Sequence, residues 1–352
     1  MDIEVKNQDR LVQLMLDRHL GNFLVATPVL SALAQHKKSL LVIHEPHAEL
    51  AKRIPTLKGP IATLPRAGSP ARDFIGFIKL LHTIRSSRPT IALDFGGSGS
   101  GGWLGAMSGA PRRICRDSAP YARRFSEHVA KPEGMEHRIE IYGAIGRAVV
   151  PELEWGWPTL EPLPSDHANL EETLRAHEID SERPMICLHV AGGKEYKHWP
   201  LPKYAQVIDT LHREGKQPIL IGARPDRAAS QEVQALCEHP PINLVQRLSI
   251  GSLIALFERA SLFIGNDSGP MHMAAATGTP IVALFGPTDP VRWGPLTNRA
   301  LIVRGTKHIP PTQGKKTFAD GRRMDSIRVE DVVSAISQSE KRFAERPESL
   351  RS

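Results

Sequence analysis

Short apolar runs alternate along the chain with longer stretches of mixed polarity. Residues 11–16, 40–44 and 91–95 are typical of buried strands, and residues 27–35 and 71–85 are typical of helices. The alternation returns in the second half, with strands predicted at 185–190, 218–221, 262–265, 281–285 and 301–303, and helices at 203–214, 227–237, 250–259 and 329–344. Strands that alternate with helices predict parallel sheets covered by helices.

A stretch rich in proline and acidic residues, 151–166, separates the two halves and has the composition of a connector. The sequence therefore predicts an α/β protein with two doubly wound domains, residues 1–160 and 161–352, facing each other across a cleft. The final helix is a candidate to dock back on the first domain.

Composition narrows the possible partners. The formal charge of +7 is compatible with an anionic small ligand, nucleic acid or an anionic membrane surface. Aromatic residues make up only 5% of the chain, which argues against base-stacking nucleic-acid platforms, so no nucleic-acid partner is predicted. No apolar run approaches a membrane span, the first ten residues are too polar for a signal peptide, and three scattered cysteines fit a reducing cytoplasm.

Residues 262–295 contain the most informative pattern, a strand followed by a tight turn, a short helix and another strand. Asp267, Ser268 and Gly269 are turn and N-cap residues, and the proline that follows suits the first helical position. Free backbone N–H groups at such a helix start, at the edge where α/β sheets bind ligands, predict a phosphate site. His272 lies beside the same turn.

A second candidate loop, residues 191–200, follows the first strand of the second half. Gly192 and Gly193 allow close approach of the backbone to a phosphate, and Lys194 and Lys197 supply positive charge. The alternative is a surface loop with solvated lysines. The position at the carboxyl end of a strand favours the functional interpretation.

Two glycine-containing segments of the first half are weaker signals. Residues 97–102 match the dinucleotide pattern G-x-G-x-x-G, but they follow a late strand and lack the acidic residue expected about twenty positions on, so a close-packed turn is favoured. Residues 21–28 are predicted to form a turn between the first strand and the first helix. That turn would place Asn22 at the mouth of the cleft, or Asn22 would cap the helix.

A basic cluster lies in a stretch that reads as a loop. Its members are Arg112, Arg113, Arg116, Arg123 and Arg124. Such a cluster is usually a solvated face, but it could also hold an anionic acceptor. No Asp-x-Asp pair and no His-x-x-x-His is present, so no metal or other cofactor is predicted.

These segments together resemble glycosyltransferase family 9, the ADP-heptose:lipopolysaccharide heptosyltransferases. The longest match is residues 266–278 with 284–290 and Gly294-Pro295. Residues 21–28, 93–97, 108–113, 197–200 and 324–332 also match, in the same order along the chain. The resemblance implies a GT-B fold, with the nucleotide sugar on the second domain and the acceptor on the first. It also implies inverting, metal-independent transfer of a heptose from an ADP-sugar to an anionic, lipid-linked saccharide of the lipopolysaccharide core, in the cytoplasm and in peripheral contact with the inner membrane face.

The resemblance also assigns donor contacts. Lys197 is expected at the donor phosphates with the backbone of Gly192 and Gly193 beside it. The residues expected around the phosphates and the sugar are Asp267, Ser268, Gly269 and His272. Leu248 stands where relatives pack against adenine, and Asp226 is a candidate ribose ligand.

One position departs from the family. In many relatives an aspartate follows the first-loop glycine and is assigned as the general base, whereas this chain has Asn22. An amide cannot take a proton near neutral pH. Asp17 and His19 are the nearest titratable substitutes. Two alternatives therefore stay open beside a transferase: a nucleotide-sugar-binding protein without catalysis, and a nucleotide-sugar epimerase of the same fold.

Overall fold

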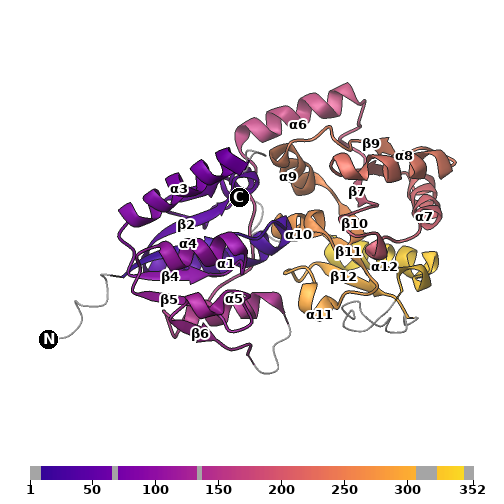
Figure 1. The fold of residues 1–352 in the computed structure, drawn as a ribbon. Coiled ribbons are helices and arrows are strands. Elements are labelled where there is room, and N and C mark those ends of the chain that lie inside the picture. Colours follow the sequence, from indigo (N-terminus) through magenta and orange to yellow (C-terminus); the bar gives the residue numbers. More distant parts are fainter. Residues whose placement is uncertain (1–8, 66–69, 133–136, 307–322, 345–352) are drawn as a thin grey trace. The chain divides into compact units, whose positions relative to one another are not determined.

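The computed structural model describes residues 9–65, 70–132, 137–306 and 323–344. The chain divides into two compact units, Met1–Pro158 and Thr159–Ser352. Each unit has its own sheet of six parallel strands (Figure 1).

The first unit has the strand order β3-β2-β1-β4-β5-β6. Its strands are β1 (Arg10–Met15), β2 (Lys38–His44), β3 (Ile61–Leu64), β4 (Ile91–Asp94), β5 (Arg112–Arg116) and β6 (Glu127–Val129). Its helices are α1 (Leu20–His36), α2 (Ala48–Ala51), α3 (Pro70–Ser86), α4 (Gly99–Met107) and α5 (Arg138–Arg147), with short 3₁₀ turns η2 (Glu45–His47) and η3 (Ala122–Arg124).

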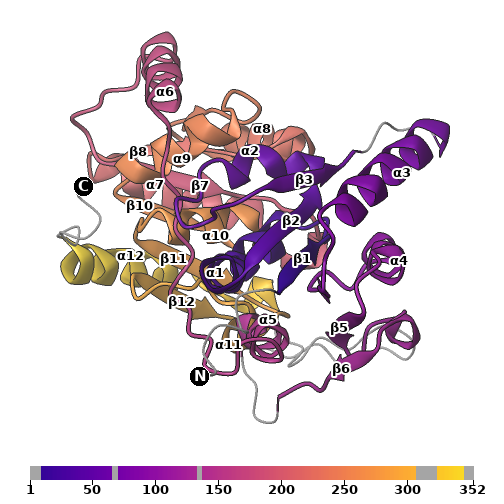
Figure 2. The same cartoon turned by 90° about the vertical axis from the view of Figure 1, so that its left-hand side faces the viewer.

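Alternate residues of β1 face opposite sides of this sheet. Val12 and Leu14 belong to a core cluster with residues of α3 and α4, while the Gln13 amide donates to the Leu30 carbonyl of α1 at 3.3 Å. Helices α3 and α4 therefore cover one face, and α1 with α5 covers the other, as Figure 2 shows.

The second unit has the order β12-β11-β10-β7-β8-β9. Its strands are β7 (Met185–His189), β8 (Gln217–Leu220), β9 (Ile242–Asn243), β10 (Leu262–Asn266), β11 (Ile281–Phe285) and β12 (Ala300–Arg304). Its helices are α6 (Pro164–Ala176), α7 (Leu201–Arg213), α8 (Arg227–Leu236), α9 (Ile250–Arg259), α10 (Gly269–Ala276), α11 (Pro290–Trp293) and α12 (Val329–Phe343), with 3₁₀ turns η4 (Glu195–Lys197), η5 (Arg224–Asp226) and η6 (Met324–Ser326).

The two sheets have the same strand order. When the strands of each unit are counted along the chain, they lie side by side in the order third, second, first, fourth, fifth and sixth. The order reverses between β1 and β4 in one unit and between β7 and β10 in the other. Open α/β sheets bind ligands at the carboxyl ends of the strands at such a reversal.

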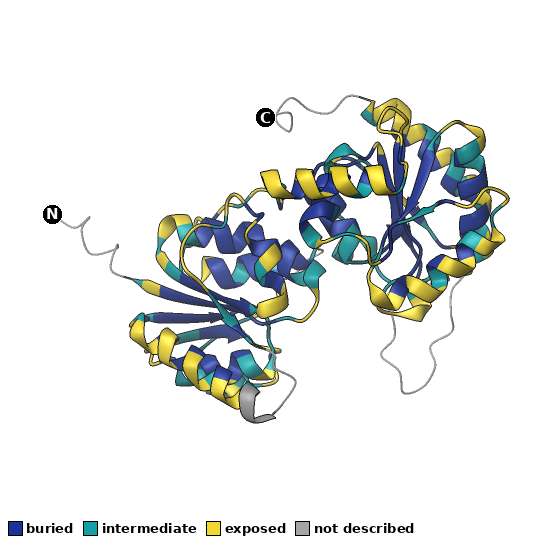
Figure 3. Cartoon of the chain, turned by 90° about the horizontal axis from the view of Figure 1, so that it is seen from above, coloured by how far each residue is buried: buried dark blue, intermediate teal, exposed yellow. Residues whose placement is uncertain are grey.

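The sheet of the second unit is buried between two helix layers, drawn dark blue in Figure 3. Helices α7, α8 and α12 contribute to the core on one face, where Trp199 is fully buried. Helices α9 and α10 pack on the other side, and α6 packs on α9. Helix α12 contacts α7, β11 and β12.

The α/β class and the parallel sheets predicted from the apolar pattern are confirmed. Two local predictions in the first unit are wrong. Residues 21–28 do not form a turn but lie within α1, whose N-cap is His19, so Asn22 is not the cap. Arg112, Arg113 and Arg116 lie on β5 and not in a loop. In the part of the chain that the structure describes, no helix is long and apolar enough to cross a membrane.

Candidate functional sites at the two sheet reversals

In the second unit, the ends of β7 and β10 are tied together by buried polar groups. The Tyr204 hydroxyl donates to the side-chain oxygen of Asn266 at 3.0 Å and lies 3.3 Å from the His189 carbonyl. The Asn266 amide donates to the Ala191 carbonyl at 3.4 Å. These bonds fix the edge of the sheet from which the two candidate phosphate loops begin.

The start of α10 lies at this edge. Ser268 is its N-cap residue, but the Ser268 hydroxyl makes no capping bond and instead pairs with Nδ1 of His189 at 3.0 Å. The first turn of a helix carries N–H groups without intrahelical partners, and its dipole favours negative charge. An uncapped helix start at the ligand-binding edge is suited to an anion.

Lys197 brings a positive charge to the same place. Its ammonium group lies 2.6 Å from the Asp267 carboxylate, and the two side chains are 24% and 8% exposed. The loop that carries Lys197 is anchored by the Trp199 ring nitrogen, which donates to the Ile327 carbonyl at 3.1 Å, and by the His198 ring, 2.8 Å from the Gly192 carbonyl. Lys197 is therefore positioned rather than freely mobile.

The glycines of this loop lie differently from each other. A Cβ atom on Gly192 would lie 3.8 Å from the Ser268 Cβ, so this backbone passes beside the start of α10. Gly193 is exposed with open space around it, and Lys194 is exposed at the start of η4. The two loops singled out from the sequence are thus brought together through Gly192 and Lys197.

A buried histidine links Ser268 to Asp226. Nε2 of His189 lies 3.4 Å from an Asp226 oxygen, which also accepts the Ala223 backbone N–H at 2.7 Å. Burial alone would raise the pKa of Asp226, but the hydrogen bond from His189, its charge and the Ala223 N–H together lower it. Asp226, proposed above as a ribose ligand, is thus already engaged within the protein.

His189 and Tyr204 were not singled out from the sequence, and Asn266 was expected in the turn after the strand, whereas it is the last residue of β10. His189 and Asn266 are the last residues of β7 and β10, so a polar residue ending a buried strand was the available signal. Two further predicted donor contacts, His272 and Leu248, lie at or just before the starts of α10 and α9. His272 is buried in the first turns of α10, and Leu248 is half-buried just before Ser249, the N-cap of α9.

In the first unit, the loop between β1 and α1 carries a carboxylate with three donors. One Asp17 oxygen accepts the His19 backbone N–H at 2.8 Å and lies 2.9 Å from Nδ1 of the His19 ring. The other accepts the Asn22 amide at 2.7 Å. Burial would raise the pKa of Asp17, but the His19 N–H, the Asn22 amide and the His19 ring hold it below its ordinary value.

A cleft of about 400 Å³ lies at the carboxyl ends of β1, β2 and β3. His47 is buried in its wall, stacked on Phe23 with ring centroids 5.1 Å apart. Burial, then the neighbouring His44, lowers the pKa of His47. The lining combines aromatic and charged groups: Arg18, His44, Pro46, His47, Leu64, Pro65, Asp73, Phe74, Phe77 and Ser100.

Asp94 and Arg116 lie at the carboxyl ends of β4 and β5. Burial raises the pKa of Asp94 to about 6, although the Gly97 N–H and the Arg116 charge oppose the shift. Burial, then Arg138, lowers the pKa of Arg116. Among the described residues, one Asp94 oxygen and Nε of Arg116 have no hydrogen-bond partner.

The five arginines of the predicted cluster have different partners in the structure. Arg112 forms two bonds to Glu127, at 2.8 and 2.9 Å, and Arg113 donates to the Ala110 and Arg124 carbonyls, both from the amino end of β5. Arg124 lies over the Trp103 ring, 4.0 Å from its centroid, and Arg123 is exposed on η3. Arg116 alone of the three strand arginines lies at the carboxyl end of β5.

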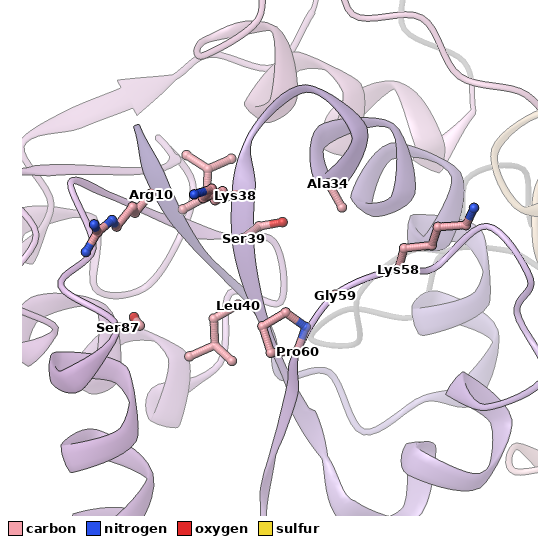
Figure 4. A pocket seen from close by; sticks show the side chains of 10 residues that line it. Arg10, Ala34, Lys38, Ser39, Leu40, Lys58, Gly59, Pro60 and Ser87 are labelled. Carbon is pink, nitrogen blue, oxygen red and sulfur yellow. The ribbon is translucent and has the colours of Figure 1, made fainter. Parts of the chain in front are cut away.

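A second cleft of the first unit, about 470 Å³, lies at the opposite edge of the sheet (Figure 4). Arg10, Lys38 and Lys58 line it, at or just before the amino ends of β1, β2 and β3. This is the edge away from the carboxyl ends where α/β sheets bind ligands. Over the described ranges, no group of three or more His, Cys, Asp or Glu residues could hold a metal ion.

Known structures share this architecture. A family 9 glycosyl transferase from Veillonella parvula DSM 2008 has a TM-score of 0.81 at 22% identity, covering 95% of this chain and 97% of that one. The ADP-heptose lipopolysaccharide heptosyltransferase II of E. coli has a TM-score of 0.75 at 21% identity, covering 96% and 100%. Two six-stranded parallel sheets with these neighbours define the GT-B fold of glycosyltransferases.

The sequence comparison defines the family. The model of glycosyltransferase family 9 (heptosyltransferase) matches residues 77–321. Lipopolysaccharide heptosyltransferase 3 of Escherichia coli is 25% identical over 340 residues, which cover 91% of this chain and 96% of that protein. The chain belongs to glycosyltransferase family 9, and the resemblance inferred from its motifs is confirmed.

Proposed function

We propose that this glycosyltransferase moves a heptose from an ADP-sugar to an anionic saccharide of the lipopolysaccharide core. The observation that carries the proposal is the pairing of Lys197 with Asp267 beside the uncapped start of α10. An ammonium group and a helix start together match the charge of a diphosphate. The full-length similarity to lipopolysaccharide heptosyltransferase 3 supports the choice of sugar and acceptor.

The donor site belongs to the second unit. The diphosphate would lie against the first turn of α10, with Gly192 allowing its oxygens close to the backbone and Lys197 exchanging part of its contact with Asp267 for a phosphate oxygen. Transfer is inverting, by direct displacement at the anomeric carbon. Lys197 and the helix start stabilise the leaving diphosphate, so the reaction needs no metal.

The acceptor site belongs to the carboxyl edge of the first sheet. The cleft beside Arg18 contains the aromatic rings of Phe74 and Phe77, which suit the apolar face of a sugar. Arg116 carries a positive charge at the end of β5, at the same edge of the sheet. Phe74, Ile75 and Ile78 of α3 are 65%, 53% and 45% exposed. This apolar surface supports peripheral contact with the inner membrane face, where a lipid-linked acceptor lies.

The test is a reconstituted transfer reaction. Purified protein is given ADP-heptose and heptose-deficient lipopolysaccharide, with and without EDTA, and the acceptor is weighed by mass spectrometry. A mass gain of one heptose that survives EDTA is expected. Turnover of the nucleotide sugar without an acceptor would indicate an epimerase, and donor binding with no transfer to any acceptor would indicate a binding protein. Either result would overturn the proposal.

A further inference from the structure

The loop between β1 and α1 holds a carboxylate–imidazole pair at the reversal point of the first sheet. Asp17 is largely buried, with 14% of its side chain exposed, whereas the His19 side chain is 77% exposed. The buried partner is fixed by three hydrogen bonds, and the exposed ring extends from it into solvent. One end of the imidazole is therefore held while the other end is accessible.

The hydrogen bonds determine which ring nitrogen carries the proton. The pKa of Asp17 is lowered, so its carboxylate is ionised at neutral pH and can only accept. Nδ1 of His19, 2.9 Å from that carboxylate, must then be the donor. In the neutral ring the lone pair is left on Nε2, the outer nitrogen.

Asn22 completes the arrangement rather than competing with it. Its amide donates to the second Asp17 oxygen at 2.7 Å, so each carboxylate oxygen has a donor. On the neighbouring turn, His47 hydrogen-bonds to Arg18, and its pKa is affected by Asp17 and His19. Asp17 also interacts electrostatically with Arg116 at the end of β5 and with Tyr142 of α5. Burial and the charge of His44 lower the pKa of His47, so the positively charged form of this ring is disfavoured beside His19.

We infer that His19 is the general base of the transfer reaction and that Asp17 is its positioning residue, an assignment that rests on the proposed function. Nε2 of His19 takes the proton from the acceptor hydroxyl. The electron pair of that hydroxyl oxygen forms the bond to the anomeric carbon of the donor sugar, and the carbon–oxygen bond to the nucleoside diphosphate breaks with its electrons on the leaving phosphate. The proton on His19 then passes to solvent.

The surroundings of the pair suit this role. Arg18, between Asp17 and His19 in the chain, lines the cleft that contains Phe74 and Phe77. A saccharide in that cleft would bring its hydroxyl groups near the exposed end of the loop. The residue between Asp17 and His19 therefore lines the same cleft to which the acceptor is assigned.

The decisive experiment compares His19→Gln with His36→Gln. Each change removes one exposed imidazole, His19 at the start of α1 and His36 at its end, but only His19 is paired with Asp17. We expect His19→Gln to lower kcat by about 100-fold or more, in the range of a general base, with an unchanged Kd for ADP by calorimetry. His36→Gln should keep full activity. Wild-type kcat should fall as the pH drops and the imidazole is protonated, and His19→Gln should lose this dependence.

Two further variants make the assignment falsifiable. Asp17→Asn should lower kcat and shift the acid limb of the pH profile, because the ring loses the carboxylate that fixes its tautomer. Asn22→Asp should give no gain, because a second carboxylate next to Asp17 adds repulsion. Equal kcat for His19→Gln and wild type, or at least a tenfold gain for Asn22→Asp, would overturn the role of His19 while leaving the transferase itself established. Absence of transfer by the wild type would instead refute the proposed function.

Discussion

The two units have the same strand order but different chemistry where that order reverses. At the ends of β7 and β10, the polar groups are Lys197, Asp267 and Ser268 beside a helix start, an arrangement for binding phosphate. At the ends of β1 and β4, they are Asp17, His19 and Asp94, which are suited to holding or moving protons. The shared topology therefore determines where a site lies, and the loop residues determine what the site does.

The difference follows from how each loop meets its helix. In the second unit, Ser268 bonds to His189 and leaves the first turn of α10 uncapped for a ligand. In the first unit, the N-cap residue of α1 is His19, whose backbone N–H and ring both point to Asp17. Neither helix start has a side-chain cap. The difference lies in the loop carboxylates: Asp17 is engaged by groups of its own loop and of α1, whereas Asp267 is paired with Lys197 of a second loop.

The largest effect on ligand binding is expected from Lys197→Ala. A hydrogen bond between charged groups contributes about 1.5–3 kcal/mol, and here the loss also leaves the Asp267 carboxylate, 8% exposed, facing the incoming phosphates. We expect the Kd for ADP to rise by about 100-fold in titration calorimetry. Lys341→Ala, which removes an exposed lysine from α12 of the same unit, should leave the Kd unchanged.

A double variant separates the two contributions. If repulsion from Asp267 is part of the loss, Lys197→Ala with Asp267→Asn should bind ADP more tightly than Lys197→Ala alone. Equal affinity of Lys197→Ala and wild type would show that the phosphates do not lie at this pair. The second unit would then have no phosphate-binding role assigned to the Lys197–Asp267 pair.

The second prediction concerns stability in the first unit. Because burial raises the pKa of Asp94 to about 6, the folded state holds this proton more tightly than the unfolded chain, where it leaves near pH 4. The stabilisation is present below about pH 4 and is lost as the pH rises through 6, by at most about 1.4 kcal/mol per pH unit. Asp94→Asn should remove this dependence, so its unfolding free energy relative to wild type should rise by about 2 kcal/mol between pH 4.5 and 7.

Urea unfolding at four pH values between 4.5 and 7.5 measures this difference. Asp117→Asn is the matched control, because it neutralises an exposed aspartate that directly follows β5, two residues after Cys115, the partner of Asp94 in the sheet. The control should follow the wild-type pH dependence. A constant difference between Asp94→Asn and wild type across the range would show that Asp94 does not titrate in the folded unit.

Much of the fold could be predicted from the sequence, because buried parallel strands are continuous apolar runs. Residues 281–285 and 250–259 were predicted with the boundaries that the structure has. The start of α1 could not be predicted in the same way, because Gly21 suggested a turn, whereas burial of residues 23–33 stabilises a helix that contains this glycine. Likewise, β5 begins with two arginines that suggested a loop, but its backbone pairs with β4.

The candidate site was predictable where chemistry is local in the chain, and not where it depends on topology. The loops at 191–200 and 266–272 carry glycine, lysine and turn residues that indicate phosphate binding by themselves. The link from Ser268 through His189 to Asp226 joins three strand ends that are far apart in the sequence, so only the sheet order reveals it. The equal strand order of the two units was also hidden, since the sequence shows no repeat.

The smallest effect is expected from the arginines of β5, and it tests the acceptor side of the comparison. Arg112 is saturated by Glu127 at the amino end of the strand, whereas Arg116 lies at the carboxyl end, with its pKa lowered by burial and by Arg138. An acceptor anion would relieve the repulsion between Arg116 and Arg138. We therefore expect Arg116→Gln to raise the acceptor KM by about 10-fold, or about 1.4 kcal/mol, with the ADP Kd unchanged, and Arg112→Gln to leave both constants as they are. If Arg112→Gln raised the acceptor KM instead, the acceptor anion would bind at the amino edge of the sheet. The rule that both units bind ligands at their carboxyl edge would then fail for the first unit.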